Sequence, residues 1–149
     1  MKYVSYLFEL ERTASVPNAK KVLIVDDEAS VRRLTARMLK SLAYETIEAE
    51  GPSEAMTTCN EHGSEIDLII TDFNMPELSG TEMMEKIRED LPQMKVIYVS
   101  GFDMDTVSTN APSAADTFLQ KPYSRDTLKD LVEKILFAPV DEEEEKKDD

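Results

Sequence analysis

Short apolar runs alternate with segments of helical period through residues 21–137. The apolar runs predict strands at residues 21–25, 45–49, 66–71, 95–99 and 117–120. A segment of helical character follows each predicted strand, so that a βα unit is repeated five times. This alternation is typical of α/β proteins. It predicts a doubly wound, five-stranded parallel sheet of the (βα)5 type with helices packed against it.

The first predicted helix follows the strand at 21–25. Its apolar residues recur at spacings of three, four and four positions, which predicts a buried stripe of Val31, Leu34, Met38 and Leu42. The polar face of the same helix is formed by Arg32, Arg33, Arg37 and Lys40. We therefore expect this helix to pack on the sheet through four apolar side chains.

Turn and capping signals predict the next two helices. The turn at residues 51–53 leads into a second helix that ends near His62. A third helix begins near Ser79 and ends before Pro92, and its inward face is formed by Met83, Met84 and Ile87.

The two remaining helices differ in the strength of their pattern. Residues 102–115 contain a proline and several poor helix formers, so the fourth helix is predicted to be short. Ser124 is predicted to cap the last helix. The apolar face of that helix is formed by Leu128, Leu131, Val132, Ile135 and Leu136.

Polar side chains stand at the carboxyl ends of four predicted strands. Asp26 and Asp27 follow the first strand, Asp72 the third, Ser100 the fourth and Lys121 the fifth. Because these ends lie along one edge of an open parallel sheet, we expect the five side chains to converge. Three adjacent carboxylates repel one another unless a cation lies among them, and an all-oxygen site suits Mg²⁺. The sequence therefore predicts a magnesium pocket.

A carboxylate in such a pocket can attack phosphorus and form an acyl phosphate. Asp72 is the candidate nucleophile, because it stands alone at the end of the central strand. Lys121 is expected to neutralise a bound phosphoryl group, and Ser100 to donate a hydrogen bond to it. Simpler roles stay open: the paired aspartates as helix caps, Lys121 as a surface lysine and Ser100 as a turn residue.

Four segments occur in this order along the chain: VLIVDDE, LIITDFNMPELSG, VIYVSG and FLQKPYS. Together they resemble the receiver domain of two-component response regulators, over residues 20–137. The resemblance implies a flavodoxin-like receiver fold that takes a phosphoryl group from a histidine kinase or a histidine phosphotransfer protein. It implies output by conformational change or by onward phosphotransfer. It also implies that the chain is not an enzyme, beyond catalysing its own phosphorylation and dephosphorylation.

Carried over residue by residue, the resemblance makes Asp72 the phosphoacceptor. Mg²⁺ is then held by Asp27, Asp72 and the backbone carbonyl of Asn74, while Asp26 beside them acts mainly through water. Lys121 pairs with the phosphoryl group.

The resemblance also names the parts of a switch. Ser100 becomes the switch hydroxyl, and Phe118, three residues before Lys121, becomes the switch aromatic. A ring fixed in the core is the alternative for Phe118. The peptide bond from Lys121 to Pro122 is commonly cis in the family.

Other interpretations of the acidic site remain. Phosphatases of the haloacid dehalogenase type also use an aspartate nucleophile with Mg²⁺, but their DxDx[TV] signature follows the first strand, where this chain reads DDEAS. A non-phosphorylated interaction scaffold is a second alternative. The SGF and FLQKPY segments resemble the C-terminal receiver of hybrid histidine kinases, and a stand-alone regulator is the rival arrangement.

Charge and composition narrow the class of partner. The net charge is −14; residues 141–149 contribute −5 and residues 1–19 sum to zero, so that −9 remains in residues 20–140. This excess disfavours direct binding to nucleic acid and favours a protein partner. With one cysteine, Cys59, and one histidine, His62, a zinc cluster of Cys and His residues is not expected.

The ends of the chain differ in composition from residues 20–137. Residues 1–19 are predicted to be an N-terminal extension or linker, and residues 138–149 an acidic disordered tail. No apolar run approaches the ~20 residues that cross a bilayer. We therefore expect a cytoplasmic protein without membrane insertion.

Overall fold

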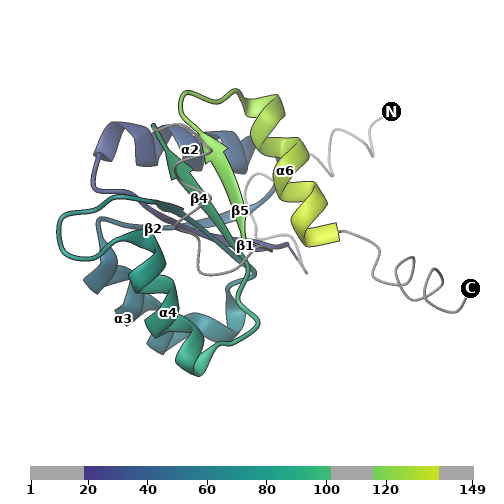
Figure 1. Ribbon diagram of the computed structural model, residues 1–149. Coiled ribbons are helices and arrows are strands. Elements are labelled where there is room, and N and C mark those ends of the chain that lie inside the picture. The colour runs from purple at the N-terminus through teal and green to yellow at the C-terminus, as the bar shows by residue number, and fades with distance from the viewer. Residues whose placement is uncertain (1–18, 102–115, 138–149) are drawn as a thin grey trace, which may run out of the picture.

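Five parallel strands form one sheet in the computed structural model, which describes residues 19–101 and 116–137 (Figure 1). The strands are β1 (Lys21–Val25), β2 (Glu45–Ala49), β3 (Leu68–Asp72), β4 (Val96–Ser100) and β5 (Thr117–Gln120). Their order across the sheet is β2-β1-β3-β4-β5, and every neighbouring pair is parallel. The predicted α/β class and parallel sheet are confirmed, with β3 in the centre.

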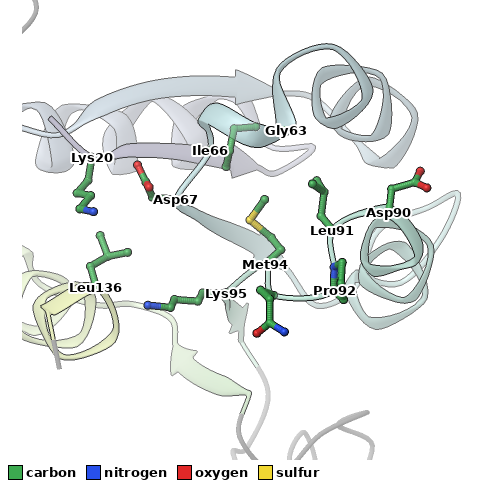
Figure 2. A pocket seen from close by; sticks show the side chains of 11 residues that line it. Lys20, Gly63, Ile66, Asp67, Asp90, Leu91, Pro92, Met94, Lys95 and Leu136 are labelled. Carbon is green, nitrogen blue, oxygen red and sulfur yellow. The ribbon is translucent and has the colours of Figure 1, made fainter. Parts of the chain in front are cut away.

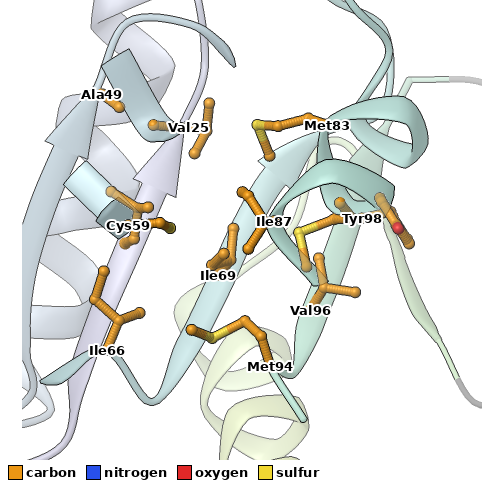
Figure 3. Packing of buried hydrophobic residues seen from close by; sticks show 13 residues of the cluster. Val25, Ala49, Cys59, Ile66, Ile69, Met83, Ile87, Met94, Val96 and Tyr98 are labelled. Atoms are coloured by element: carbon orange, nitrogen blue, oxygen red, sulfur yellow. The ribbon is translucent and has the colours of Figure 1, made fainter. Parts of the chain in front are cut away.

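Helices cover both faces of the sheet (Figure 1). The helices are α2 (Ala29–Ser41), α3 (Pro52–His62), α4 (Gly80–Asp90) and α6 (Arg125–Phe137), with a short 3-10 turn, η1 (Gly63–Glu65). Alternate strand residues point to opposite faces, so Val22 and Ile24 pack with α2 and α6, whereas Leu23 and Val25 pack with α3 and α4. Figure 3 shows the second of these clusters. The sheet is therefore buried on both sides.

The bounds of β3 and β4 differ from the prediction by one or two residues. β3 begins at Leu68 because Ile66, although buried, ends the η1 turn and makes no strand pairing. The ladder continues through Asp72, which lies opposite Val99, and β4 continues to Ser100. The polar residues Asp72 and Ser100 thus belong to the strands themselves.

The predicted buried stripe of α2 is wrong at Leu34, whereas Val31, Met38 and Leu42 are partly buried. The helix buries Arg32, Thr35, Ala36 and Leu39, whereas Leu34 is 52% exposed. Arg32 can be buried because its guanidinium donates hydrogen bonds to the Glu48 carboxylate and to the Asp26 carbonyl oxygen. Arg33, Arg37 and Lys40 are exposed, as predicted.

The capping predictions for the other helices are confirmed. Ser79 accepts a hydrogen bond from the backbone N–H of Glu82, whose side chain accepts one from the Ser79 N–H in return. Ser124 accepts from the Thr127 N–H at 3.1 Å. The inward faces predicted for α4 and α6 are buried or partly buried.

Several sequence predictions fall on residues that the structure does not describe. They are the fourth helix at 102–115, the tail at 138–149 and nearly all of the extension at 1–19. Among the described residues, each helix is too short or too polar to span a lipid bilayer.

Candidate acidic phosphoryl-acceptor site

Three carboxylates meet at the carboxyl edge of the sheet. Asp26 and Asp27 follow β1 directly, and Asp72 is the last residue of β3, the neighbouring strand. Carboxylate oxygens from the three residues all lie within 4.8 Å of one another. Asp26 is buried, Asp72 is partly buried and Asp27 is exposed, so the cluster opens toward solvent on one side. The predicted convergence is confirmed, and the group can hold a metal ion.

Lys121 brings a positive charge to the same cluster from the edge strand β5. Its Nζ lies 3.3 Å from Asp26 Oδ2 and 3.7 Å from Asp72 Oδ2. Glu28 Oε1 lies at 4.0 Å. The ammonium therefore bridges the acidic group of β1 and the carboxylate of β3, and one cation is shared by several anions.

The excess of negative charge shifts the pKa values of both Asp72 and Lys121. Burial is the main cause that raises the pKa of Asp72, and the Asp26 and Asp27 carboxylates raise it further, against the opposing effect of Lys121. Burial alone would lower the pKa of Lys121, but the Asp72 and Asp26 carboxylates outweigh it, so that the pKa is raised. The surroundings thus favour the charged form of Lys121 and disfavour the charged form of Asp72.

Backbone contacts hold the acidic residues in place. Asp26 Oδ1 accepts a hydrogen bond from the Glu28 N–H at 2.9 Å, and Asp72 Oδ1 accepts one from the Asn74 N–H at 3.4 Å. Gly80 lies against the strand end, where an added Cβ would lie 2.5 Å from the Asp72 backbone oxygen. The turn after β3 and the start of α4 therefore pack directly on the residue that carries the central carboxylate.

The predicted switch residues lie on β4 and on the edge strand β5, next to the acidic cluster. Ser100 is buried at the end of β4, and its carbonyl oxygen accepts a hydrogen bond from the Lys121 N–H at 2.8 Å. Phe118 is partly buried and lies opposite Tyr98 in the strand register. The two rings stack with centroids 5.3 Å apart, and Phe73, the residue after Asp72, contacts both. The bond from Lys121 to Pro122 is cis, as the resemblance predicted.

Arg32 is a site residue that the sequence reasoning missed. Its Nη1 donates to the Asp26 carbonyl oxygen at 2.9 Å, and its Nε donates to Glu48 of β2 at 3.1 Å. The guanidinium thus fixes the backbone that presents Asp26 and Asp27. Its residue type does not distinguish it from the neighbouring Arg33, and only its position on the buried side of α2 would have revealed it.

A hollow of about 360 Å³ lies near the amino ends of the strands, opposite the carboxylate cluster (Figure 2). Lys20, Asp67, Met94 and Leu136 are among the residues around it, and these precede strands or end a helix. None of the predicted site residues lines this hollow. The candidate site is therefore the cluster of carboxylates at the carboxyl ends of the strands.

A model of the response regulator receiver domain matches residues 22–133. The chain belongs to this family. The receiver is 34% identical over 129 residues to the sensor kinase CckA of Brucella abortus, covering 86% of this chain and 14% of that protein. It is 30% identical over 120 residues to the chemotaxis protein CheY of Pseudomonas aeruginosa, covering 78% of this chain and 95% of CheY.

Solved receivers share the fold. The crystal structure of the response regulator TrrA from Thermotoga maritima in complex with Mg²⁺ and beryllofluoride superposes with a TM-score of 0.70 at 33% identity, covering 78% of this chain and 99% of TrrA. The chain is therefore a receiver of two-component signalling with the flavodoxin-like fold. These relatives give no support to the phosphatase or the scaffold interpretation. The family match at 22–133 lies within the predicted range of 20–137.

Proposed function

We propose that Asp72 accepts the phosphoryl group of a phosphohistidine in a histidine kinase or histidine phosphotransfer protein. The observation that carries this proposal is the position of its carboxylate, 3.7 Å from the Lys121 ammonium and grouped with Asp26 and Asp27. An Asp72 oxygen attacks phosphorus, the bond from phosphorus to the imidazole nitrogen breaks, and an acyl phosphate forms. The imidazole leaves with the electron pair of that bond.

Asp72 suits this role better than the other two carboxylates. Asp26 is buried and already accepts hydrogen bonds from Glu28 and Lys121. Asp27 is exposed and lies at the open side of the cluster. Asp72 is held by the central strand, and burial raises its pKa, which makes its oxygen more basic and more nucleophilic.

The acidic cluster fits Mg²⁺, because its ligands are hard oxygen atoms on residues held close together. In the proposal Asp27, Asp72 and the backbone carbonyl of Asn74 hold the ion, and Asp26 acts through water. When bound, the ion neutralises the charge that the phosphoryl oxygens bring to the pocket. Lys121 binds one of these oxygens from the other side of Asp72.

Ser100 and Phe118 are proposed to report the phosphorylated state. Ser100 ends a strand beside the site, and its hydroxyl donates a hydrogen bond to a phosphoryl oxygen. Phe118 lies on the next strand and packs against Tyr98 and Phe73, so a shift of the β4 end changes its packing. Output then follows by this conformational change or by onward phosphotransfer to a histidine.

In this proposal the domain catalyses only its own phosphorylation and dephosphorylation. Its partners are proteins, and the negative charge of residues 20–140 argues against direct binding to nucleic acid. Turnover of small phosphate esters by the purified chain would instead favour the phosphatase interpretation.

Acetyl phosphate with Mg²⁺ tests the assignment of Asp72. We expect intact mass to rise by one phosphoryl group, and Asp72→Asn to abolish the rise. Asp67→Asn is a matched control, because Asp67 is also a partly buried aspartate that accepts a backbone hydrogen bond but lies at the opposite edge. A label that persists in Asp72→Asn, or is lost in Asp67→Asn, contradicts the assignment.

A further inference from the structure

Tyr123 connects the loop after β5 to helix α2. Its hydroxyl oxygen lies 2.5 Å from Thr35 Oγ1, although the two residues are 88 positions apart in sequence. The Thr35 hydroxyl donates its own hydrogen to the Val31 carbonyl at 3.0 Å. Because a hydroxyl has only one hydrogen, Tyr123 must be the donor and Thr35 the acceptor in the contact between them. The hydrogen bond therefore has a defined direction.

The surroundings of this hydrogen bond are partly buried and largely apolar. Thr35 is 2% exposed, and Tyr123 packs against the apolar cluster formed by α2, α6 and the sheet. Burial raises the pKa of Tyr123, so its hydroxyl stays protonated and able to donate. A hydrogen bond in such surroundings holds its partners more firmly than one exposed to water.

The position of Lys121 in the fold explains why a hydrogen bond from the same loop matters. Lys121 follows β5, the edge strand, whereas the aspartates that it contacts follow β1 and end β3. Its own N–H is bound to Ser100, and the next residue, a proline, has no N–H to donate. Tyr123 is therefore the next anchor along the loop, and it attaches the loop to the helix that begins just after Asp27.

We propose that the hydrogen bond from Tyr123 to Thr35 positions Lys121 for phosphoryl transfer, by holding the lysine-bearing loop against α2 with the ammonium beside Asp72. Tyr123 and Thr35 are positioning residues, since neither side chain contacts the carboxylates. This inference rests on the proposed function of Asp72. It assigns a role to the polar contact of Thr35, a residue whose burial the apolar pattern of α2 did not predict.

Tyr123→Phe removes the donor and keeps the ring. We expect it to slow phosphorylation of Asp72 by acetyl phosphate, and to weaken beryllofluoride binding in the presence of Mg²⁺, by about three- to tenfold each. The affinity for Mg²⁺ alone should be unchanged or higher, because the proposed metal ligands are intact and the ammonium competes less well for them. A general loss of structure would lower all three quantities together.

Thr35 supplies the reciprocal variants. Thr35→Val should reproduce the effect of Tyr123→Phe, and the double variant should be no worse than either single variant. Thr35→Ser keeps the hydroxyl and should behave as the wild type. Tyr44→Phe is the matched control: Tyr44 packs against the same cluster but lies before β2, at the opposite edge of the sheet, and its loss should change neither rate nor affinity.

A Lys121→Ala background separates positioning from a purely structural role. If the contact acts through Lys121, Tyr123→Phe has no further effect once the ammonium is gone. An equal effect in both backgrounds overturns the inference. So does a wild-type rate and beryllofluoride affinity in Tyr123→Phe when Lys121→Ala lowers both. A label that persists in Asp72→Asn would instead refute the proposed function, independently of Tyr123.

Discussion

The surroundings of Asp72 disfavour its charged form, which lowers the stability of the folded protein but makes the carboxylate more reactive toward phosphorus. Asp72 ends a central strand, and its neighbours include two further carboxylates but only one ammonium. Burial and the like charges raise its pKa, so the folded protein holds the proton of Asp72 more tightly than the unfolded chain does. The ionised residue therefore destabilises the folded state, and a bound cation relieves this repulsion.

Without Mg²⁺, we expect the Asp72→Asn variant to be more stable than the wild type at pH 7, because the amide carries no charge. Since the folded pKa is raised, the difference should shrink as the pH falls through it, and vanish below the unfolded value of about 3.9, where Asp72 is protonated in both states. Urea unfolding at several pH values measures it.

Magnesium provides the control for the Asp72 experiment. A cation that binds only the folded protein adds about 2.7 kcal/mol to the free energy of unfolding at one hundred times its dissociation constant. Wild type should gain this stability and Asp72→Asn should gain much less of it. The difference between their free energies of unfolding should therefore shrink or change sign. A variant that is less stable than wild type without Mg²⁺ would show that Asp72 is chiefly structural.

At the scale of elements, sequence patterns predicted the strands better than the faces of the helices. A strand buried on both sides is apolar throughout, so its presence follows from composition alone. The face of α2 could not be predicted in this way, because Arg32 and Thr35 are buried through contacts to Asp26, Glu48 and Tyr123. These contacts join segments distant in the chain, and no local period encodes them.

The candidate site was predictable for a related reason. The rule that parallel strands end along one edge depends on topology and not on side-chain packing, so Asp26, Asp72 and Lys121 could be grouped before the structure was known. The resemblance to receivers then supplied roles. The supporting contacts of Arg32 and Tyr123 could not be predicted, because they depend on how deeply each helix and loop is seated.

Helix α4 packs closely on the strand that carries Asp72. Gly80, its first residue, lets the helix approach the end of β3, and an added Cβ would lie 2.5 Å from the backbone oxygen of Asp72. Because that atom belongs to the backbone of a central strand, relief requires the helix to move. We expect Gly80→Ala to lower the free energy of unfolding by about 1–3 kcal/mol and to slow phosphorylation of Asp72.

Gly101→Ala is the matched control for Gly80→Ala, since no atom of residues 19–101 or 116–137 lies within 4 Å of its added Cβ. It should leave the urea unfolding curve close to that of the wild type. If the two alanine variants are equally stable, the close approach of α4 to the strand does not limit the packing at this edge.

At the scale of the molecule, the site is joined to the face of α3 and α4 through aromatic rings. Phe73 follows the phosphoacceptor candidate, and its ring meets Tyr98 edge-on with centroids 5.8 Å apart. Tyr98 in turn stacks on Phe118 of the edge strand. Nearby, Arg88 of α4 pairs with Asp116, just before β5, at 3.1 Å. A displacement at the carboxyl edge therefore has a packed route to the outer strand and to α4.

The last prediction tests this route with beryllofluoride and Mg²⁺, which mimic the acyl phosphate. We expect NMR signals to change at Phe118 and Tyr98 as well as beside Asp72, because Ser100 moves toward the bound group and alters the packing below it. Signals of Tyr44, at the opposite edge, should stay constant. Ser100→Ala should still be phosphorylated, since the hydroxyl is not the nucleophile, but its remote changes should be smaller. Lys121→Ala should lose more, because a charge contact is removed. Changes confined to residues that touch Asp72, or remote changes that survive in Ser100→Ala, would mean that the domain does not signal by this route and would favour onward phosphotransfer without a large conformational change.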